Sequence, residues 1–225
     1  PSTFLATVRM FAGSEPDSGS DPANMRTVAK KVEGGWRLNG SKLWITNATI
    51  ADIAIVWAKT AEGIRGFIVE KEFAGFIRRK IKLKMSLRAS VTGELIFDDV
   101  FVPEANLLPH SERGLSAALS CLSQARYGIA WGTMGAAMAC FDVTRHYLLE
   151  RKQFDKPVAS FQLVQKDLAT MYNEIIKAQW MNLQVGRLKD QKRETHVMIS
   201  LIKGNACREA LKIARTCRNL LGANG

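Results

Sequence analysis

The spacing of apolar residues changes once along this chain, and that change limits what it can fold into. Up to about Val102, short apolar runs alternate with glycine, asparagine and aspartate, which predicts antiparallel strands and hairpins. After Gly114 the spacing becomes helical and stays so. We therefore expect an α+β, multi-domain protein, with a β domain at residues 1–108 and a helical domain at residues 113–225.

The expected β domain is small and antiparallel, similar to a barrel or a sandwich. Its clearest hairpin joins Thr27–Glu33 to Trp36–Leu38 through the paired glycines Gly34 and Gly35. In Lys80–Met85 lysines alternate with apolar residues, which predicts a strand with one wet face and one dry face. The remaining strands are expected at residues 53–59, 64–70 and 95–102.

Three long helices are predicted in the second half, because apolar residues recur there at steps of three and four. The first runs from Leu115 to about Arg151, and the second begins near Ser160, a suitable N-cap. The third carries its apolar residues from Met198 to Leu221. Helices of this kind pack as antiparallel bundles, so we expect an incomplete four-helix bundle whose fourth helix lies beyond Gly225.

Composition narrows the function classes. Of the 225 residues, 47% are apolar and 24% are charged, which is typical of soluble globular chains. No apolar run approaches the roughly 20 residues that a membrane span needs, so no membrane insertion is expected. The net charge of +11 is concentrated after His110. Without basic clusters interleaved with aromatic residues, this surplus is more typical of solvated helix faces or an anionic ligand than of a nucleic-acid site.

Metal binding is not expected either. The four cysteines show no CxxC or His-paired spacing, which argues against zinc and against a disulfide framework. Neither His146 nor His196 has a second ligand at helical spacing, and His110 lies in the linker.

Two segments suggest a ligand site. Residues 11–22 combine hydroxyls, carboxylates and glycines in one loop, which can bring backbone N–H groups close to an anionic or heteroaromatic ligand. Taken alone, this composition is more typical of a solvated turn. In Lys42–Asn47, Trp44 and Thr46 lie two residues apart on one strand face, which suits a flat ring with polar edges. Taken alone, Trp44 is more typical of a core.

Together with Glu150–Phe154 at the end of the first long helix, these segments resemble the acyl-CoA dehydrogenase family of flavoenzymes. Ser86–Ser90, Ala125–Gly132 and Gly186–Asp190 are most similar to its glutaryl-CoA branch. The resemblance runs the length of the chain. It covers the family's middle β domain and most of its C-terminal helical domain.

The resemblance implies the ligand-binding residues. Residues that match the family's FAD contacts are Phe11, Ser14, Gly19, Ser20, Trp44, Thr46, Arg151, Gln153, Phe154, Gln162, Asn219 and Gly222. Those that match the acyl-CoA pocket are Ser20, Arg126 and Tyr127. Thr46 would lie near N5 of the flavin, and Arg151 would bind the diphosphate of FAD in a neighbouring subunit.

The sequence departs from the family's pattern in three ways. Gly13 replaces a branched apolar residue, and Ala223 replaces the second glycine of a Gly-Gly-Asn-Gly turn. The family's catalytic glutamate lies beyond that turn, and its N-terminal helical domain has no counterpart here. We therefore expect a partial chain that contains no catalytic residue and is inactive alone.

The function that the resemblance implies is α,β-dehydrogenation of glutaryl-CoA with FAD, followed by decarboxylation to crotonyl-CoA. The implied context is a homotetramer in a mitochondrial matrix or a bacterial cytoplasm, with electron-transfer flavoprotein or a similar acceptor. Two alternatives stay open: another short-chain acyl-CoA dehydrogenase or oxidase, and a noncatalytic subunit that only assembles with full-length copies.

Overall fold

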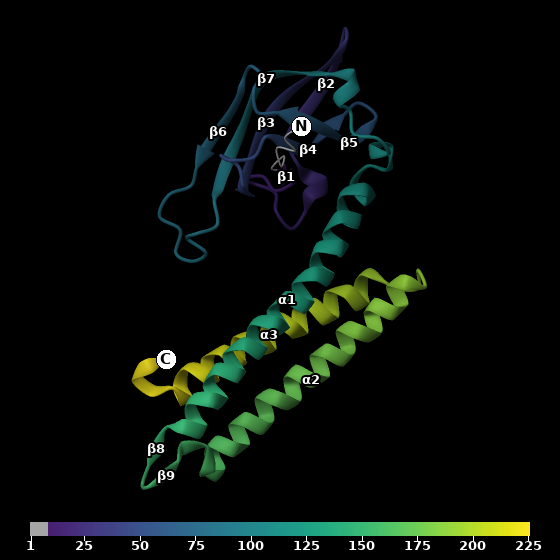
Figure 1. Cartoon of the computed structure of the whole chain (residues 1–225). Coiled ribbons are helices and arrows are strands. Elements are labelled where there is room, and N and C mark those ends of the chain that lie inside the picture. The colour runs from purple at the N-terminus through teal and green to yellow at the C-terminus, as the bar shows by residue number, and fades with distance from the viewer. Residues whose placement is uncertain (1–8) are drawn as a thin grey trace, which may run out of the picture. The chain divides into compact units, whose positions relative to one another are not determined.

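A computed structural model of the chain describes residues 9–225, which form two compact units that divide between Ser120 and Cys121. The α+β class is confirmed: the first unit is built around strands and the second around long helices (Figure 1). Residues 1–8 of the expected β domain lie outside the described residues.

The first unit contains one mixed sheet (Figure 1). Its strands are β1 (Arg9–Ala12), β2 (Val28–Val32), β3 (Gly35–Thr46), β4 (Ile53–Thr60), β5 (Gly63–Glu70), β6 (Phe76–Lys80) and β7 (Thr92–Pro103). They follow the order β1-β4-β2-β3-β7-β6, and β5 pairs with β4. Short 3-10 helices are η1 (Pro22–Asn24), η2 (Glu104–Asn106) and η3 (Ser111–Arg113).

The predicted hairpin forms, and the strands expected at residues 53–59 and 64–70 pair as a second one. Val32 pairs with Gly35 in the β2–β3 hairpin, and Thr60 pairs with Gly63 in the β4–β5 hairpin. The expectation of a purely antiparallel sheet is wrong, because β4 runs parallel to both β1 and β2. These parallel pairs join strands that are far apart in sequence, so no short turn forces them to be antiparallel.

The strand predicted at Lys80–Met85 is also wrong. Strand β6 ends at Lys80, and the following residues form an irregular loop. The side chains of Leu83 and Met85 are 102% and 96% exposed, so the expected dry face does not exist. Alternation predicts a strand only where a partner is available, and β7 pairs instead with Phe76–Lys80.

The main core of this unit is an apolar cluster built by alternate residues of neighbouring strands, and a smaller cluster contains Met25, Trp57 and Ala118. Leu38, Phe67 and Leu95 have no exposed surface and belong to β3, β5 and β7. Trp36 packs edge-on against Phe67 with 5.4 Å between ring centroids. The buried side chains hold β3 firmly, and β3 carries Trp44 and Thr46 at its end.

The second unit is built from long helices (Figure 1). Helix α1 (Leu115–Glu150), which begins in the first unit, is followed by the short hairpin β8 (Lys152–Gln153) and β9 (Lys156–Pro157). Then come η4 (Val158–Ser160), α2 (Gln162–Asp190), α3 (His196–Leu220) and η5 (Gly222–Asn224). Within residues 9–225, none of the helices combines the length and apolar character that a bilayer span requires.

The helix boundaries match the predictions closely, with local corrections. Ser160 is not the N-cap of α2: Phe161 holds that place, and the Ser160 hydroxyl donates to the Pro157 carbonyl instead. On α3 the N-cap is Thr195, whose side chain accepts from the Met198 amide. Met198 was expected on the apolar stripe but is exposed, because its neighbour Ile199 faces the core.

The apolar spacing of α2 predicts Met181 on its buried face. Met181 is exposed, however, and Asn182 is buried in its place. The Asn182 side-chain amide donates to the Ala130 carbonyl on α1 at 3.0 Å, which compensates for burying a polar group. The core of the unit otherwise consists of apolar residues such as Met134, Ile175 and Ile202.

Candidate functional site

A buried ion pair organises the loop that follows β1. The Lys42 ammonium lies 2.8 Å from the Glu15 carboxylate, and the two side chains are 0% and 3% exposed. The same carboxylate also accepts hydrogen bonds from the Arg26 and Thr27 backbone amides. Because every partner is polar and well placed, the pair can stay charged in the interior.

The buried contacts of Glu15 and Lys42 shift the pKa values of both side chains. Burial alone would raise the pKa of Glu15, but the hydrogen bonds from the Arg26 amide and the Lys42 ammonium outweigh it, so the pKa lies below its usual range. Burial lowers the pKa of Lys42, and Glu15 offsets only part of that effect. Sequence reasoning missed this pair, because nothing in the spacing of two residues so far apart signals a contact.

The ion pair fixes the loop against β3. Lys42 also donates to the Gly13 carbonyl, and the Leu43 amide donates to the Ser14 carbonyl at 3.0 Å. Ser14, one of the residues predicted to contact FAD, is therefore held beside the strand that carries Trp44. All four predicted contacts of this segment, Phe11, Ser14, Gly19 and Ser20, are exposed.

Trp44 has an unusual backbone conformation and an exposed side chain. Its φ of +62° lies in the left-handed region, which costs a bulky residue about 1–2 kcal/mol. The β3–β7 register shifts between Lys42 and Ile45, so Trp44 sits on a bulge. Its side chain is 60% exposed, while neighbouring Ile45 is buried. Thr46 is exposed as well, so the chain presents an indole and a hydroxyl outside the core. Strain held at an exposed aromatic residue is typical of ligand sites.

The second group of predicted FAD contacts lies at one end of the helical unit, which holds both the β8–β9 hairpin and the C-terminus (Figure 1). The Asn224 side-chain amide donates to the Tyr147 hydroxyl at 3.1 Å, which ties the end of α3 to the end of α1. Exposed members of this group are Arg151, Gln153, Phe154, Gln162, Asn219 and Gly222.

The hairpin holds its tip in a defined shape. The Val158 amide donates to the Arg151 carbonyl at 2.8 Å, and Phe154 has a φ of +53°. The Phe154 ring is 87% exposed and meets Phe161 edge-on at 6.1 Å. Among the described residues no carboxylate forms an ion pair with Arg151, so its guanidinium is available to an anionic ligand.

Arg126 and Tyr127, the predicted acyl-CoA contacts, are half-buried on α1. The Tyr127 hydroxyl faces α2, where it donates to the Asn182 carbonyl at 3.5 Å and fills the notch left by Gly186. The side chain thus helps to join two helices. Within residues 9–225, Arg126 forms no ion pair.

Sequence reasoning also missed Glu209, a carboxylate on α3 whose side chain is only 9% exposed. Burial would raise its pKa, but hydrogen bonds from Lys212 and Arg208, both at 3.0 Å, outweigh that and lower it. The two cations neutralise the carboxylate, so we assign it a structural role.

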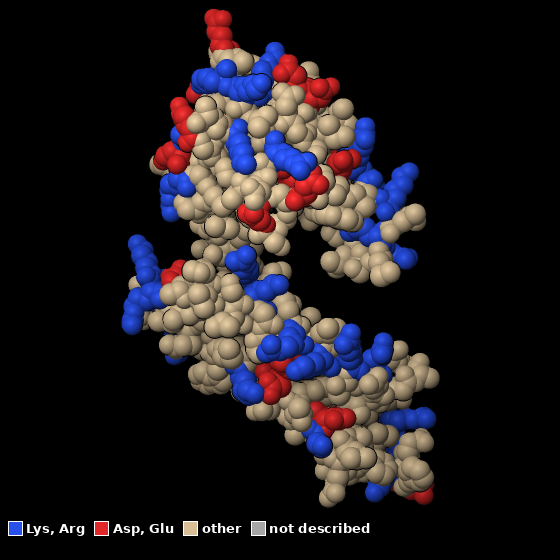
Figure 2. All heavy atoms as spheres, turned by 180° about the vertical axis from the view of Figure 1, so that it is seen from behind, with Lys and Arg blue, Asp and Glu red and all other residues tan. Residues whose placement is uncertain are grey.

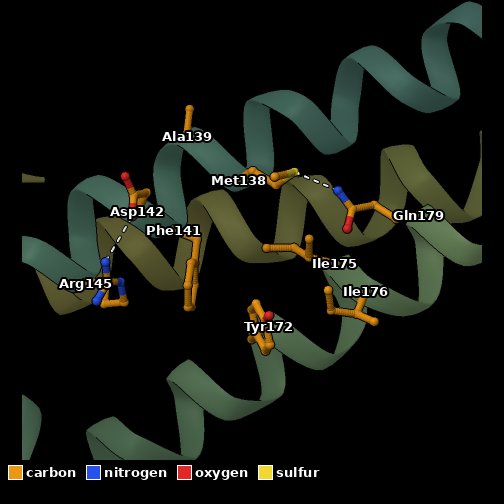
Figure 3. Close-up of a pocket in the computed structure, with 9 residues that line it drawn as sticks. All are labelled: Met138, Ala139, Phe141, Asp142, Arg145, Tyr172, Ile175, Ile176 and Gln179. Carbon is orange, nitrogen blue, oxygen red and sulfur yellow. Dashed lines mark hydrogen bonds and ion pairs between the residues drawn. The ribbon is translucent and has the colours of Figure 1, made fainter.

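A pocket of about 480 Å³ opens between α1 and α2 and contains no predicted site residue (Figure 3). Its lining is mainly apolar, with Phe141 stacked on Tyr172 at 5.8 Å between centroids. The polar contacts at its edge are internal: Gln179 donates to the Met138 sulfur, and Arg145 pairs with Asp142 (Figure 3).

Comparison with known proteins gives a consistent picture. Residues 10–100 match the family model "Acyl-CoA dehydrogenase, middle domain", and residues 112–225 match "Acyl-CoA dehydrogenase, C-terminal domain". Among curated proteins, the mitochondrial isovaleryl-CoA dehydrogenase of Solanum tuberosum is 36% identical over 97% of this chain and 54% of its own length.

Solved structures add further matches. Glutaryl-CoA dehydrogenase from Mycobacterium smegmatis, also solved in complex with FADH2, is 48% identical with a TM-score of 0.93, over 97% of this chain and 56% of that one. Butyryl-CoA dehydrogenase from Megasphaera elsdenii is 32% identical with a TM-score of 0.91, over 97% and 58%. The chain thus spans about half the length of the proteins that it matches.

Proposed function

The chain belongs to the acyl-CoA dehydrogenase family, and from this premise we propose that it forms the FAD- and thioester-binding parts of a glutaryl-CoA dehydrogenase. The observation that carries the substrate proposal is the 48% identity to the Mycobacterium smegmatis glutaryl-CoA enzyme along 97% of the chain. Identity to the butyryl-CoA enzyme over the same share is 32%.

The described residues fit FAD at the end of β3. Trp44 offers an exposed aromatic face for a planar ring, and the Thr46 hydroxyl can donate a hydrogen bond to the ring's polar edge. When bound, FAD supplies an acceptor for the hydride that leaves the acyl β-carbon. The Glu15–Lys42 pair keeps the loop of Ser14 against this strand and so maintains the shape of the site.

We propose that the hairpin end of the helical unit serves the FAD of a second copy in a homo-oligomer, a tetramer by family resemblance. Arg151 would grip the diphosphate with its forked guanidinium, assisted by Gln153 and Gln162. Phe154 would pack against the adenine end. These side chains are exposed and extend from a hairpin with a fixed tip, which suits contact with another subunit.

Ser20, Arg126 and Tyr127 are proposed to line the acyl-thioester pocket. Arg126 has no acidic partner among residues 9–225, so its charge is available to the substrate. We assign no catalytic base within this sequence. In the proposed reaction a carboxylate from elsewhere removes the α-proton while hydrogen bonds stabilise the developing enolate. The β-hydrogen leaves as hydride, and the resulting glutaconyl-CoA loses CO2 and takes up a proton at the γ-carbon to give crotonyl-CoA.

Flavin reduction tests this proposal. The native polypeptide that contains this sequence is mixed anaerobically with glutaryl-CoA, isovaleryl-CoA or butyryl-CoA, and bleaching of the yellow flavin is followed. We expect glutaryl-CoA to reduce the flavin fastest and to release CO2. Faster reduction by isovaleryl-CoA without CO2 would transfer the assignment to that branch, which the 36% identity to the Solanum tuberosum enzyme favours as second candidate.

If the purified protein is yellow and no acyl-CoA bleaches it, the remaining alternative holds, a noncatalytic subunit that assembles with full-length copies. For the active enzyme we propose electron-transfer flavoprotein or a similar acceptor as the partner. The proposed location is a mitochondrial matrix or a bacterial cytoplasm; the name of the Solanum tuberosum relative includes the word "mitochondrial".

A further inference from the structure

A lysine in the loop between β6 and β7, residues 81–91, makes polar contacts that the proposed function does not use. The Lys84 ammonium donates to the Leu87 and Ser90 carbonyls and to the Thr92 hydroxyl, at 2.8, 2.6 and 2.7 Å. The Thr92 hydroxyl in turn donates to the Ser90 carbonyl at 3.2 Å. An ammonium has three N–H groups, so each of them has an acceptor here. Lys84 is therefore part of the internal framework of this loop, called here the β6–β7 loop.

The groups that Lys84 contacts are all neutral. Between residues 73 and 93 there is no aspartate or glutamate, and within residues 9–225 Lys84 forms no ion pair. In Figure 2 a lobe projects from the first unit where the β6–β7 loop lies, and its visible face shows basic and uncharged residues only. Hydrogen bonds from a charged donor are shorter and stronger than those from a neutral one, so the ammonium orients the carbonyls and the hydroxyl that it binds.

Two of these acceptors belong to one tight turn. The Ser90 amide donates to the Leu87 carbonyl at 3.0 Å. Leu87 has a φ of +48°, in the left-handed region that a bulky residue seldom adopts. Because Lys84 bonds to the carbonyls at both ends of this turn, its ammonium offsets the cost of that backbone conformation. Removing the ammonium should let the turn relax.

The third acceptor connects the loop to the strand end that carries the proposed FAD contacts. Thr92 is the first residue of β7, and it lies directly opposite Thr46 in the antiparallel pairing of β3 with β7. Side chains at such opposite positions are neighbours on one face of a sheet. Backbone bonds join this junction on both sides: the Asn47 amide donates to the Val91 carbonyl at 2.8 Å, and the Ile81 amide to the Thr92 carbonyl at 2.9 Å. A shift at the start of β7 is therefore passed on to Thr46.

We propose that Lys84 is a positioning residue for the FAD site: by holding Thr92 and the turn before it, Lys84 fixes the end of β3 that presents Thr46. The inference rests on the proposed function, in which the Thr46 hydroxyl donates to the flavin ring. Lys84 acts through Thr92 and needs no contact with the flavin. The charge of this stretch does not explain the role, because the side chains of Lys80 and Lys82 are exposed and have no hydrogen-bond partner among the described residues.

Amide hydrogen exchange of the 225-residue chain without FAD tests the positioning itself. Lys84→Met removes the ammonium and keeps an unbranched side chain. The Asn47 and Ile81 amides should exchange on the order of tenfold faster in this variant, because the junction opens more readily once hydrogen bonds from a charged donor are lost. Lys82→Met, which removes an exposed lysine two residues away, should exchange like the unchanged chain. Far-ultraviolet circular dichroism verifies that both variants are folded.

Flavin binding tests whether the effect acts through Thr46. In the native polypeptide that contains this sequence, Thr46→Val should weaken FAD binding about 2- to 12-fold, the contribution of one hydrogen bond. Lys84→Met should weaken it as well. The double variant should bind FAD no more weakly than Thr46→Val alone, because both changes remove the same contact. The absorption band of the bound flavin should shift in the same direction in both single variants, which a loss of stability alone would not produce.

Each readout can overturn the proposal. Unchanged exchange of the Asn47 amide in the folded Lys84→Met variant would show that Lys84 does not hold the end of β3. Equal acceleration in Lys82→Met would assign the effect to the charge of the loop instead of the Lys84 contacts. Additive losses of FAD affinity would show that Lys84 does not act through Thr46. If the unchanged protein binds no FAD, the proposed function is wrong, and the exchange measurements alone decide whether Lys84 holds Thr46 in place.

Discussion

Trp44 is the residue on which the proposed FAD site depends most. Replacing Trp44→Ala should weaken FAD binding roughly 2- to 12-fold, the range that an aromatic contact of about 0.5–1.5 kcal/mol implies. The free energy of unfolding should hardly change, because the side chain is 60% exposed and its backbone is strained. Flavin fluorescence and urea titrations measure the two effects.

Trp180 on α2 provides the matched control, since its side chain is 64% exposed and no FAD contact is proposed for it. Trp180→Ala should leave FAD affinity unchanged. Equal losses in the two variants would show that Trp44 has no special role. The sequence indicated Trp44 as one half of an aromatic and hydroxyl pair. It could not indicate the left-handed backbone, because that conformation depends on how β3 pairs with β7.

The buried Glu15–Lys42 pair predicts a pH dependence of stability. The pKa of Glu15 is lower in the folded chain than its ordinary value of 4.5, so ionised Glu15 stabilises the fold above that value. This stabilisation is lost as pH falls through the folded pKa. Glu15→Gln should therefore be less stable than the unchanged chain at neutral pH, by about 3–5 kcal/mol, because it leaves Lys42 buried without a countercharge.

The difference in unfolding free energy between the two proteins should shrink as pH falls below the ordinary value of 4.5, where the unfolded carboxylate takes up a proton, and should disappear below the lower pKa of the folded carboxylate. Urea titrations at a series of pH values measure it. A difference that stays constant into acid would mean that the carboxylate charge contributes nothing. Asp17→Asn is a suitable control, since this carboxylate is 60% exposed and pairs with Arg26 at the surface.

At the scale of elements, the absence of a side chain at Gly186 allows α1 and α2 to pack closely. A Cβ at this position would overlap the Tyr127 hydroxyl, whereas the next atom of that ring is 3.4 Å away. Gly186→Ala should therefore destabilise the chain by about 1–3 kcal/mol despite the better helix propensity of alanine. Adding Tyr127→Phe removes the obstructing oxygen and should restore most of the loss.

Gly204 on α3 is the matched glycine, because no atom lies within 4 Å of a Cβ built there. Gly204→Ala should stabilise the chain by up to about 1 kcal/mol through helix propensity alone. Thermal unfolding monitored by circular dichroism compares the variants. If Gly186→Ala is stabilising like Gly204→Ala, the contact between Tyr127 and α2 is looser than described.

The long helices could be predicted from sequence because their signal is local and repeated many times. Individual buried positions were less predictable: Asn182 is buried because its amide reaches a carbonyl of α1, a contact that spacing does not reveal. The strand expected at residues 80–85 failed for the same reason. Its alternation is real, but pairing with β7 ends at Lys80, and pairing is a property of two segments.

At the scale of the whole molecule, the proposed FAD contacts fall into two groups on different units, Trp44 with Thr46 and Arg151 with its neighbours. The sequence could name these residues through their motifs. It could not place them in one site, because in the proposed arrangement that placement depends on contacts between copies. The proposal that a second copy supplies Arg151 therefore needs a test that distinguishes one chain from two.

Mixing two defective variants provides that test. Trp44→Ala should impair one half of the proposed site and Arg151→Gln the other, and both residues are exposed, so both variants should fold. If each site is built from two copies, random pairing after mixing should restore full FAD affinity in about a quarter of the sites, because mixed pairs contain one intact site and one doubly altered site. Flavin fluorescence titration counts them. Recovery at this level requires a shared site, whereas affinities that stay at the level of the separate variants would mean that each chain binds FAD alone.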